Sequence, residues 1–159
     1  MNHMRKLEQM YAHAPINEYF APQLTISEGS AEIRIRVRPD FHHAAGAMHG
    51  VIYFKALDDA TYFAANSLVD DVFVLTARFE IEFLRPVSSG EVRATGRVTG
   101  DDGHRIQATG ELFDEAGKGF VNFDDLMRAA KRWNLCASDL FFPLSYSYPC
   151  RPGRSTPRQ

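Results

Sequence analysis

Hydrophobic and polar positions follow two different periods along this chain. Apolar residues alternate with polar ones over 23–27 and 31–38, which predicts two strands joined at Gly29. Residues 50–68 are apolar almost all round, a pattern typical of a helix buried within its fold. Strand-like patterns return further along, over 72–85, 91–99, 104–113 and 120–123. We therefore expect one central helix among several short strands.

The strand expected over 72–85 carries the longest alternation. A regular strand would place these residues on one face: Phe73, Leu75, Ala77, Phe79, Ile81 and Phe83. Arg78, Glu80 and Glu82 mark the middle of the opposite face as solvated, whereas both faces are apolar around Val74. We therefore expect the beginning of this strand to be covered on both sides.

Short turns that each contain Gly separate the last four expected strands, at 88–90, 100–103 and 115–119. Connections this short join antiparallel neighbours. One long helix packed on one antiparallel sheet is an α+β layer architecture. The pattern therefore predicts the α+β class, with a long central helix wrapped by an antiparallel β-sheet.

Composition narrows the classes of function. The chain has 159 residues, with 18 Lys and Arg against 20 Asp and Glu, and 45% of its residues are apolar. The charge balance argues against binding duplex nucleic acid through its phosphates, and the apolar share argues against a disordered chain. No apolar run reaches the roughly 18 residues of a membrane span, and the N-terminus lacks a secretory-signal pattern. We expect a cytoplasmic protein with no nucleic-acid or membrane partner.

The chain is expected to divide into three parts. Residues 1–19 hold an N-terminal helix and a link, and residues 20–123 hold the central helix and the sheet. Residues 124–159 form a C-terminal extension, in which the apolar spacing of 124–134 predicts a short amphipathic helix. The end of this extension is rich in Pro and Arg and has no acidic residue, a composition typical of a flexible tail.

Two adjacent carboxylates, Asp58 and Asp59, interrupt the apolar helix. Burying a charge is costly unless the charge is paired or hydrogen-bonded. Lys55 lies four residues before Asp59, on the same side of a helix, and can form an ion pair with it. Asp58 is therefore the candidate for a functional carboxylate. The alternative is that both acids line a partly exposed edge of the fold.

The start of this helix is a second unusual feature. None of the usual N-cap residues precedes Gly50, where the chain reads Ala47–Met48–His49–Gly50. Free N–H groups at a helix start can hold an anion or polarise a carbonyl, although water or His49 can also cap them. Gly50 and Asp58 lie roughly 12 Å apart along a helix, at about 1.5 Å per residue. That distance is too long for one reacting atom and fits a site shared by two copies of the chain.

Other catalytic and metal-binding signatures are missing from the sequence. His42, His43 and His49 lie close together, but not at the spacing of a helical zinc motif. Cys136 and Cys150 have no paired ligands nearby. There is no GxSxG elbow, phosphate-binding loop or dinucleotide motif. We therefore predict no metal site.

Two blocks of the sequence, at residues 49–67 and 83–91, carry a family pattern. They resemble the hot dog fold acyl-CoA thioesterases, above all the phenylacetate-pathway and 4-hydroxybenzoyl-CoA thioesterases. The first is His49–Ser67, HGVIYFKALDDATYFAANS, which is similar to the family's His-Gly-Gly helix start followed by an acid and an Ala-rich run. The second block, with Phe83–Pro86 and Ser89–Glu91, is similar to the next block of the family pattern. The resemblance covers about residues 20–123 and implies a hot dog fold.

The resemblance also implies roles for individual residues. It places the catalytic acid on Asp58 and the N–H that polarises the thioester carbonyl on Gly50, preceded by His49. His43 takes the position of an amide poised over the carbonyl or the water. Thr76 takes the position of a hydroxyl that aids the water.

Two positions depart from the family pattern. Val51 replaces the second Gly, which stiffens the backbone and narrows the entrance, and His43 replaces an amide with a titratable ring. We expect the substrate to contact Val51 at this entrance, Phe54 in an acyl pocket and Arg85 near the nucleotide of CoA. The alternative for Phe54 is an ordinary place in the core.

The activity that the resemblance implies is hydrolysis of an acyl-CoA thioester to free acid and CoA, in a homodimer whose subunits share the site. Asp58 would activate water or attack directly, and Gly50 N–H would stabilise the oxyanion. No metal or organic cofactor is implied. Two alternatives stay open: a non-catalytic acyl-thioester-binding protein, and a hot dog hydratase or dehydratase that uses His49 with Asp58. The acyl group and the choice between a dimer and a dimer of dimers stay open as well.

Overall fold

The computed structural model describes residues 2–129 of the chain. In chain order the elements of these residues are α1 His3–Ala12, α2 Pro15–Phe20, β1 Gln23–Ser27, β2 Ser30–Arg36, the 3-10 turn η1 Pro39–Phe41, α3 Gly50–Asn66, β3 Val74–Phe83, β4 Glu91–Asp101, β5 Arg105–Phe113 and β6 Gly119–Ala129. None of the helices among these residues is both long enough and apolar enough to cross a membrane.

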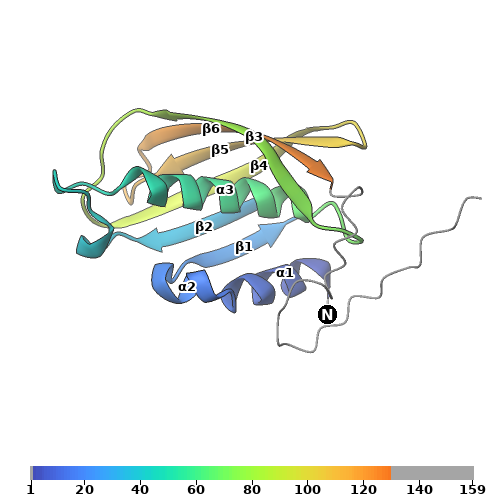
Figure 1. The fold of residues 1–159 in the computed structure, drawn as a ribbon, viewed down its shortest axis with the longest axis horizontal. Coiled ribbons are helices and arrows are strands. Elements are labelled where there is room, and N and C mark those ends of the chain that lie inside the picture. Colours follow the sequence, from blue (N-terminus) through green and yellow to red (C-terminus); the bar gives the residue numbers. More distant parts are fainter. Residues whose placement is uncertain (1, 130–159) are drawn as a thin grey trace, which may run out of the picture.

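The strands of the described residues form one antiparallel sheet in the order β1-β2-β4-β5-β6-β3. α3 lies across one face of this sheet (Figure 1). Buried side chains of α3 and of the inward positions of the strands form the core, among them Ile33, Leu57, Val92 and Leu112. This arrangement confirms the predicted α+β class, a central helix wrapped by an antiparallel sheet. The prediction that the short turn at 88–90 joins antiparallel neighbours is wrong, because β3 pairs with β6 at the edge of the sheet and not with β4.

One flank of α3 packs very closely on the sheet. Gly96 on β4 and Gly110 on β5 are paired in the register and lie under the helix. A Cβ at Gly96 would overlap the backbone carbonyl of Ala60, and a Cβ at Gly110 would lie 3.1 Å from Leu57 Cδ2. Leu57, Ala60 and Thr61 are fully buried here, and we call this side of the helix the closed flank. Its closeness depends on two residues without side chains, because any Cβ would push the helix away.

Two N-terminal helices pack beside β1 (Figure 1). α1 begins after Asn2, which caps it, and buries Tyr11. Glu8 of α1 accepts a hydrogen bond from the Ile26 N–H at 2.9 Å and so satisfies part of the free edge of β1. α2 takes the place of part of the predicted link, because Pro15 fits the first turn of a helix, where its missing N–H costs nothing.

β3 does not keep one face throughout its length. Its register with β6 shifts between Thr76 and Arg78, which leaves Ala77 as the extra residue of a β-bulge. Before the bulge Thr76 reaches α3, and after it Phe79 and Phe83 contact α3. A regular strand sends even and odd positions to opposite faces. The prediction that the odd positions of this strand share one face is therefore wrong, because the bulge transfers the inward face from even to odd positions.

The last strand is longer than the sequence pattern predicts. β6 pairs with β3 as far as Ala129 and with β5 as far as Arg128. The amphipathic helix predicted over 124–134 is therefore wrong for 124–129, which belong to the sheet. Two neighbouring strands supply hydrogen-bond partners along this segment and override its local helical spacing. The rest of the predicted extension, with Cys136 and Cys150, lies outside the described residues.

Candidate active site

Asp58 lies half-buried on the side of α3 that faces β3. Thr76 Oγ1 donates a hydrogen bond to Asp58 Oδ1 at 3.1 Å. Burial raises the pKa of the Asp58 carboxyl; the Thr76 hydrogen bond and the Lys55 charge oppose this rise, and the Asp59 charge adds to it. A carboxyl whose pKa is raised by burial is a better proton acceptor than a solvated one.

The adjacent Asp59 has partners that Asp58 does not have. Lys55 Nζ lies 2.5 Å from Asp59 Oδ2, which confirms the predicted ion pair. The Tyr11 hydroxyl, from α1, donates to the same oxygen at 2.5 Å. Within residues 2–129, Asp58 makes no ion pair. Of the two carboxylates, Asp58 is therefore the one left to act on a bound molecule.

The start of α3 carries a free backbone donor. His49 is the N-cap, and its Nδ1 accepts from the Val51 N–H at 3.2 Å. The Ile52 N–H donates to the His49 carbonyl at 2.9 Å. Among the described residues the Gly50 N–H has no acceptor. The structure thus combines both alternatives for this helix start: His49 caps one N–H group, and the Gly50 N–H stays available for an anion or a carbonyl.

His43 and His49 flank this helix start, with ring centroids 6.5 Å apart. Both rings accept a backbone N–H at Nδ1, His43 from Ala45 at 3.1 Å and His49 from Val51. A neutral imidazole that accepts at Nδ1 carries its proton at Nε2. Both exposed histidines therefore present an N–H donor on the side away from the backbone.

Three contacts between α3 and β3 follow one another along the helix. Positions 50, 54 and 58 recur every four residues and so form one stripe. The Gly50 backbone lies next to the Phe83 ring, Phe54 packs on Phe79 with ring centroids 4.5 Å apart, and Asp58 accepts from Thr76. We call this stripe, Gly50, Phe54 and Asp58, the open flank of α3. Within one chain, the aromatic pair stands between the helix start and the carboxylate.

The open flank is only partly covered by the chain itself. Phe79 and Phe83 on β3 are 46% and 52% exposed, and Val51 at the helix start is 52% exposed. Leu75 is 45% exposed, so the cover predicted on both sides of the beginning of this strand is absent within one chain. β3 lies at the edge of the sheet, with β6 on one side only among the described residues. A partner surface would bury this apolar strip.

Arg85 lies beyond the end of β3 and contacts a turn of the same chain. Its guanidinium pairs with Asp114 at 2.7 Å and donates to the carbonyls of Lys118 and Gly119. The Arg85 hydrogen bond is the main reason why the pKa of Asp114 is lowered. The structure thus places the Arg85 guanidinium against the turn between β5 and β6.

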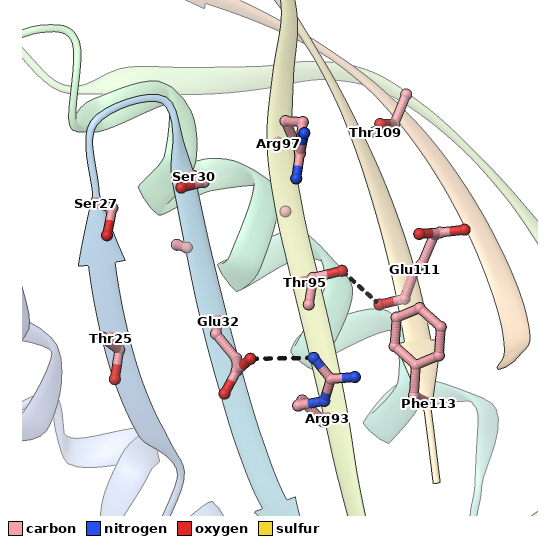
Figure 2. Close-up of a pocket in the computed structure, with 12 residues that line it drawn as sticks. Thr25, Ser27, Ser30, Glu32, Arg93, Thr95, Arg97, Thr109, Glu111 and Phe113 are labelled. Atoms are coloured by element: carbon pink, nitrogen blue, oxygen red, sulfur yellow. Dashed lines mark hydrogen bonds and ion pairs between the residues drawn. The ribbon is translucent and has the colours of Figure 1, made fainter. Parts of the chain in front are cut away.

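A shallow hollow of about 780 Å³ lies on the opposite face of the sheet (Figure 2). It is lined by Ser, Thr, Glu and Arg side chains of β1, β2, β4 and β5, with Arg93 paired to Glu32 at 3.2 Å. None of the candidate residues Asp58, Gly50 and Thr76 lines this hollow. Within residues 2–129, no group of three or more His, Cys, Asp or Glu is placed to hold a metal ion.

Two residues near the site were not singled out from the sequence. Phe83 lies next to the Gly50 backbone at the helix start. The sequence block around Phe83 was part of the family resemblance, but nothing in it predicted this contact. Tyr11 reaches Asp59 from a helix 48 residues away along the chain. No local signal predicts such a contact, because only the packing of α1 against α3 creates it.

Known proteins are similar to this chain in sequence and in fold. The profile of the Thioesterase superfamily matches residues 45–120, which include α3 and the strands that follow it. A curated relative from Saccharolobus solfataricus, named "Putative esterase", is 27% identical over 95 residues, which are 60% of this chain and 68% of that protein.

Solved structures give the same result for the fold. The PaaI protein from the phenylacetic acid degradation operon of E. coli matches with a TM-score of 0.73 and 20% identity, over 79% of this chain and 91% of that chain. A thioesterase family protein from Silicibacter pomeroyi matches with a TM-score of 0.74 and 22% identity, over 80% of this chain and 98% of that chain. The common architecture gives this chain the hot dog fold, and residues 45–120, which include the central helix, are similar to the Thioesterase superfamily.

Proposed function

We propose that this protein hydrolyses acyl-CoA thioesters, at sites that two copies of the chain share. The observation that carries the proposal is the Asp58 carboxylate: half-buried, held by Thr76 and, among residues 2–129, not engaged in an ion pair. The free Gly50 N–H at the positive end of α3 supplies the second element that the reaction needs.

The reaction uses these two groups in opposite roles. Water adds to the thioester carbonyl carbon and gives a proton to Asp58, while the Gly50 N–H stabilises the oxyanion that forms. The C–S bond then breaks, and the CoA sulfur leaves as a thiol with the proton that Asp58 returns. The products are a carboxylic acid and CoA. Direct attack by Asp58 on the carbonyl is the variant of this scheme in which water acts in the second step.

The geometry of one chain supports the proposal that two copies share the site. Gly50 and Asp58 lie roughly 12 Å apart along α3, with the Phe54–Phe79 pair between them. α3 and β3 run in opposite directions, so the helix start lies at the Phe83 end of β3 and Asp58 at its Thr76 end. Antiparallel pairing of two β3 edges, with the two-fold axis near Phe79, would bring the helix start of one copy towards Asp58 of the other.

The first test is Asp58→Asn in an assay that follows release of free thiol over a panel of aryl and fatty acyl-CoAs. We expect kcat/KM to fall by about 10²–10⁴-fold, the usual contribution of a general base. Asn keeps the shape and removes a carboxylate whose burial raises its pKa, so the melting temperature should stay the same or rise. Full activity in this variant would exclude Asp58 as the base. Binding of acyl-CoA without turnover would favour a binding protein, and water addition to an enoyl-CoA would favour a hydratase.

A complementation experiment tests the shared site. Asp58→Asn and Gly50→Pro are each expected to be inactive, and their heterodimers would contain one intact site made of Gly50 from one copy and Asp58 from the other. Subunit exchange in a 1:1 mixture should therefore restore about a quarter of the wild-type activity, as expected for random two-fold pairing. A mixture that stays inactive after exchange would mean that each site belongs to one chain.

A further inference from the structure

Lys55 lies within reach of two carboxylates. It precedes Asp58 by three residues and Asp59 by four, and both spacings make neighbours on a helix surface. In the structure its Nζ is bound to Asp59 Oδ2, at 2.5 Å. Helix geometry alone does not decide between the two acids, so contacts from outside α3 must make the choice.

These contacts come from the N-terminal helices. The Tyr11 hydroxyl donates to the same Asp59 oxygen, and the buried Tyr11 ring is held edge-on against Phe63, with centroids 5.0 Å apart. The Lys55 ammonium lies 5.3 Å from the ring centroids of both Tyr11 and Phe20. A cation is attracted by aromatic faces at this distance. α1 and α2 thus surround the ammonium on the Asp59 side of α3, opposite to β3 (Figure 1).

We propose that Tyr11 and Lys55 are positioning residues for Asp58: by binding Asp59 on the far side of α3, they leave the Asp58 carboxylate on Thr76 without a cation of its own. The proposal rests on the function proposed above, because this arrangement serves catalysis only where Asp58 is the base. It gives the N-terminal helices a part in the chemistry, although they lie outside the segment that matches the superfamily profile.

The charges around Asp58 predict the direction in which each substitution should move its pKa. Thr76 faces it from β3, and Lys55, Asp59 and Tyr62 lie on its own helix. Lys55 lowers the pKa of Asp58, and Asp59 raises it. Lys55→Met removes the lowering charge, so the pKa of Asp58 should rise. Asp59→Asn removes the raising charge and frees Lys55 to turn towards Asp58, so the pKa should fall.

The experiment measures Asp58 directly, in the full chain, by NMR titration of ¹³C-labelled Asp carboxyl carbons, with the signal assigned from its absence in Asp58→Asn. The titration midpoint should move up in Lys55→Met and down in Asp59→Asn. Tyr11→Phe keeps the ring against Phe63 and removes only the donor; Lys55 then divides between the two acids, and the midpoint should move down less than in Asp59→Asn. Arg97→Met, which removes a positive charge from the outer face of the sheet, is the matched control and should leave the midpoint unchanged.

The acid limb of kcat/KM against pH supplies a second readout and should move in the same directions. If Tyr11 and Lys55 have a purely structural role, their substitution would lower the melting temperature and leave the titration midpoint of Asp58 unchanged; that result overturns the proposal. Midpoint shifts of the same sign in Lys55→Met and Asp59→Asn overturn it as well. If Lys55→Met does not fold, the two conservative variants decide. If the Asp58 midpoint shifts as expected but the protein hydrolyses no acyl-CoA, the positioning role of Tyr11 and Lys55 is supported and the proposed function is refuted. Failure of the positioning proposal can therefore be distinguished from failure of the proposed function.

Discussion

The two flanks of α3 differ in almost every physical respect. The closed flank, Leu57, Ala60 and Thr61, has no exposed surface and lies against two strand glycines. The open flank, Gly50, Phe54 and Asp58, faces an edge strand whose aromatic residues remain about half exposed. One helix thus has a side fixed by steric contact and a side that a single chain leaves incomplete.

This difference separates stability from chemistry. On the closed flank, burial of apolar surface and close packing stabilise the fold, and no polar side chain there is left without a partner, since the Thr61 hydroxyl donates to the Leu57 carbonyl at 3.0 Å. On the open flank, a carboxylate without a cation and a free N–H reduce stability and are available for a substrate. Substitutions on the two flanks should therefore have opposite signatures.

After Asp58→Asn, the largest effect is expected at the helix start, from Gly50→Pro. Gly50 is the first residue of α3, and His49 has φ −67° and ψ 142°, which a following Pro accepts. Pro thus removes the N–H with little change in the helix. We expect kcat/KM to fall by about 10²–10³-fold, the cost of losing one oxyanion donor, with the melting temperature nearly unchanged.

Gly50→Ala is the matched control, because it keeps the N–H and adds a Cβ 3.7 Å from Phe83, an ordinary contact. Equal losses of activity in the Pro and Ala variants would show that space at Phe83, and not the N–H, matters at this position.

On the closed flank, Gly96→Ala should act in the opposite way. The new Cβ meets the backbone of Ala60, which cannot rotate aside, so α3 must move. We expect the free energy of unfolding to fall by about 3 kcal/mol, at the upper end for overpacked cores, as measured by denaturant unfolding at fixed protein concentration. Gly119→Ala, where the nearest atom lies 3.8 Å away, should change it by less than about 0.5 kcal/mol. Comparable losses in both variants would contradict a specific role for the close approach at Gly96.

The smallest effect is expected from Thr76→Val, which tests the contact across the open flank. The Thr76 hydrogen bond lowers the pKa of Asp58, so its loss should raise that pKa. A general base works only when ionised, so activity falls as the pH drops through its pKa, and a raised pKa moves this fall to higher pH. The acid limb of kcat/KM should therefore shift upwards, with the plateau at high pH less affected. An unchanged limb would mean that Thr76 does not act on the ionised carboxylate.

Local sequence patterns accounted for much of the fold. The central helix, both N-terminal strands and the hairpins β4–β5 and β5–β6 follow from periodicity and short turns, because these depend on neighbours within a few residues. The turn at 88–90 does not make such a hairpin, because β3 pairs with β6 and not with β4. The Lys55–Asp59 ion pair also agrees with local spacing, since it needs only one helical turn, although the same spacing allows a Lys55–Asp58 pair. The segment 124–129 shows the limit of such patterns: its helical spacing was overridden by β5 and β3, which pair with it from distant parts of the chain.

The sequence by itself determined the candidate residues: an acid and a helix start without a usual N-cap residue on an apolar helix, roughly 12 Å apart along it. Tertiary structure decided what surrounds them. The bulge at Ala77 turns Thr76 and Phe79 to the same side of β3, although their numbering sends them to opposite faces, and α1 brings Tyr11 to Asp59. Both outcomes depend on the pairing and packing of segments far apart in the chain, and such contacts leave no period in the sequence from which they could be predicted.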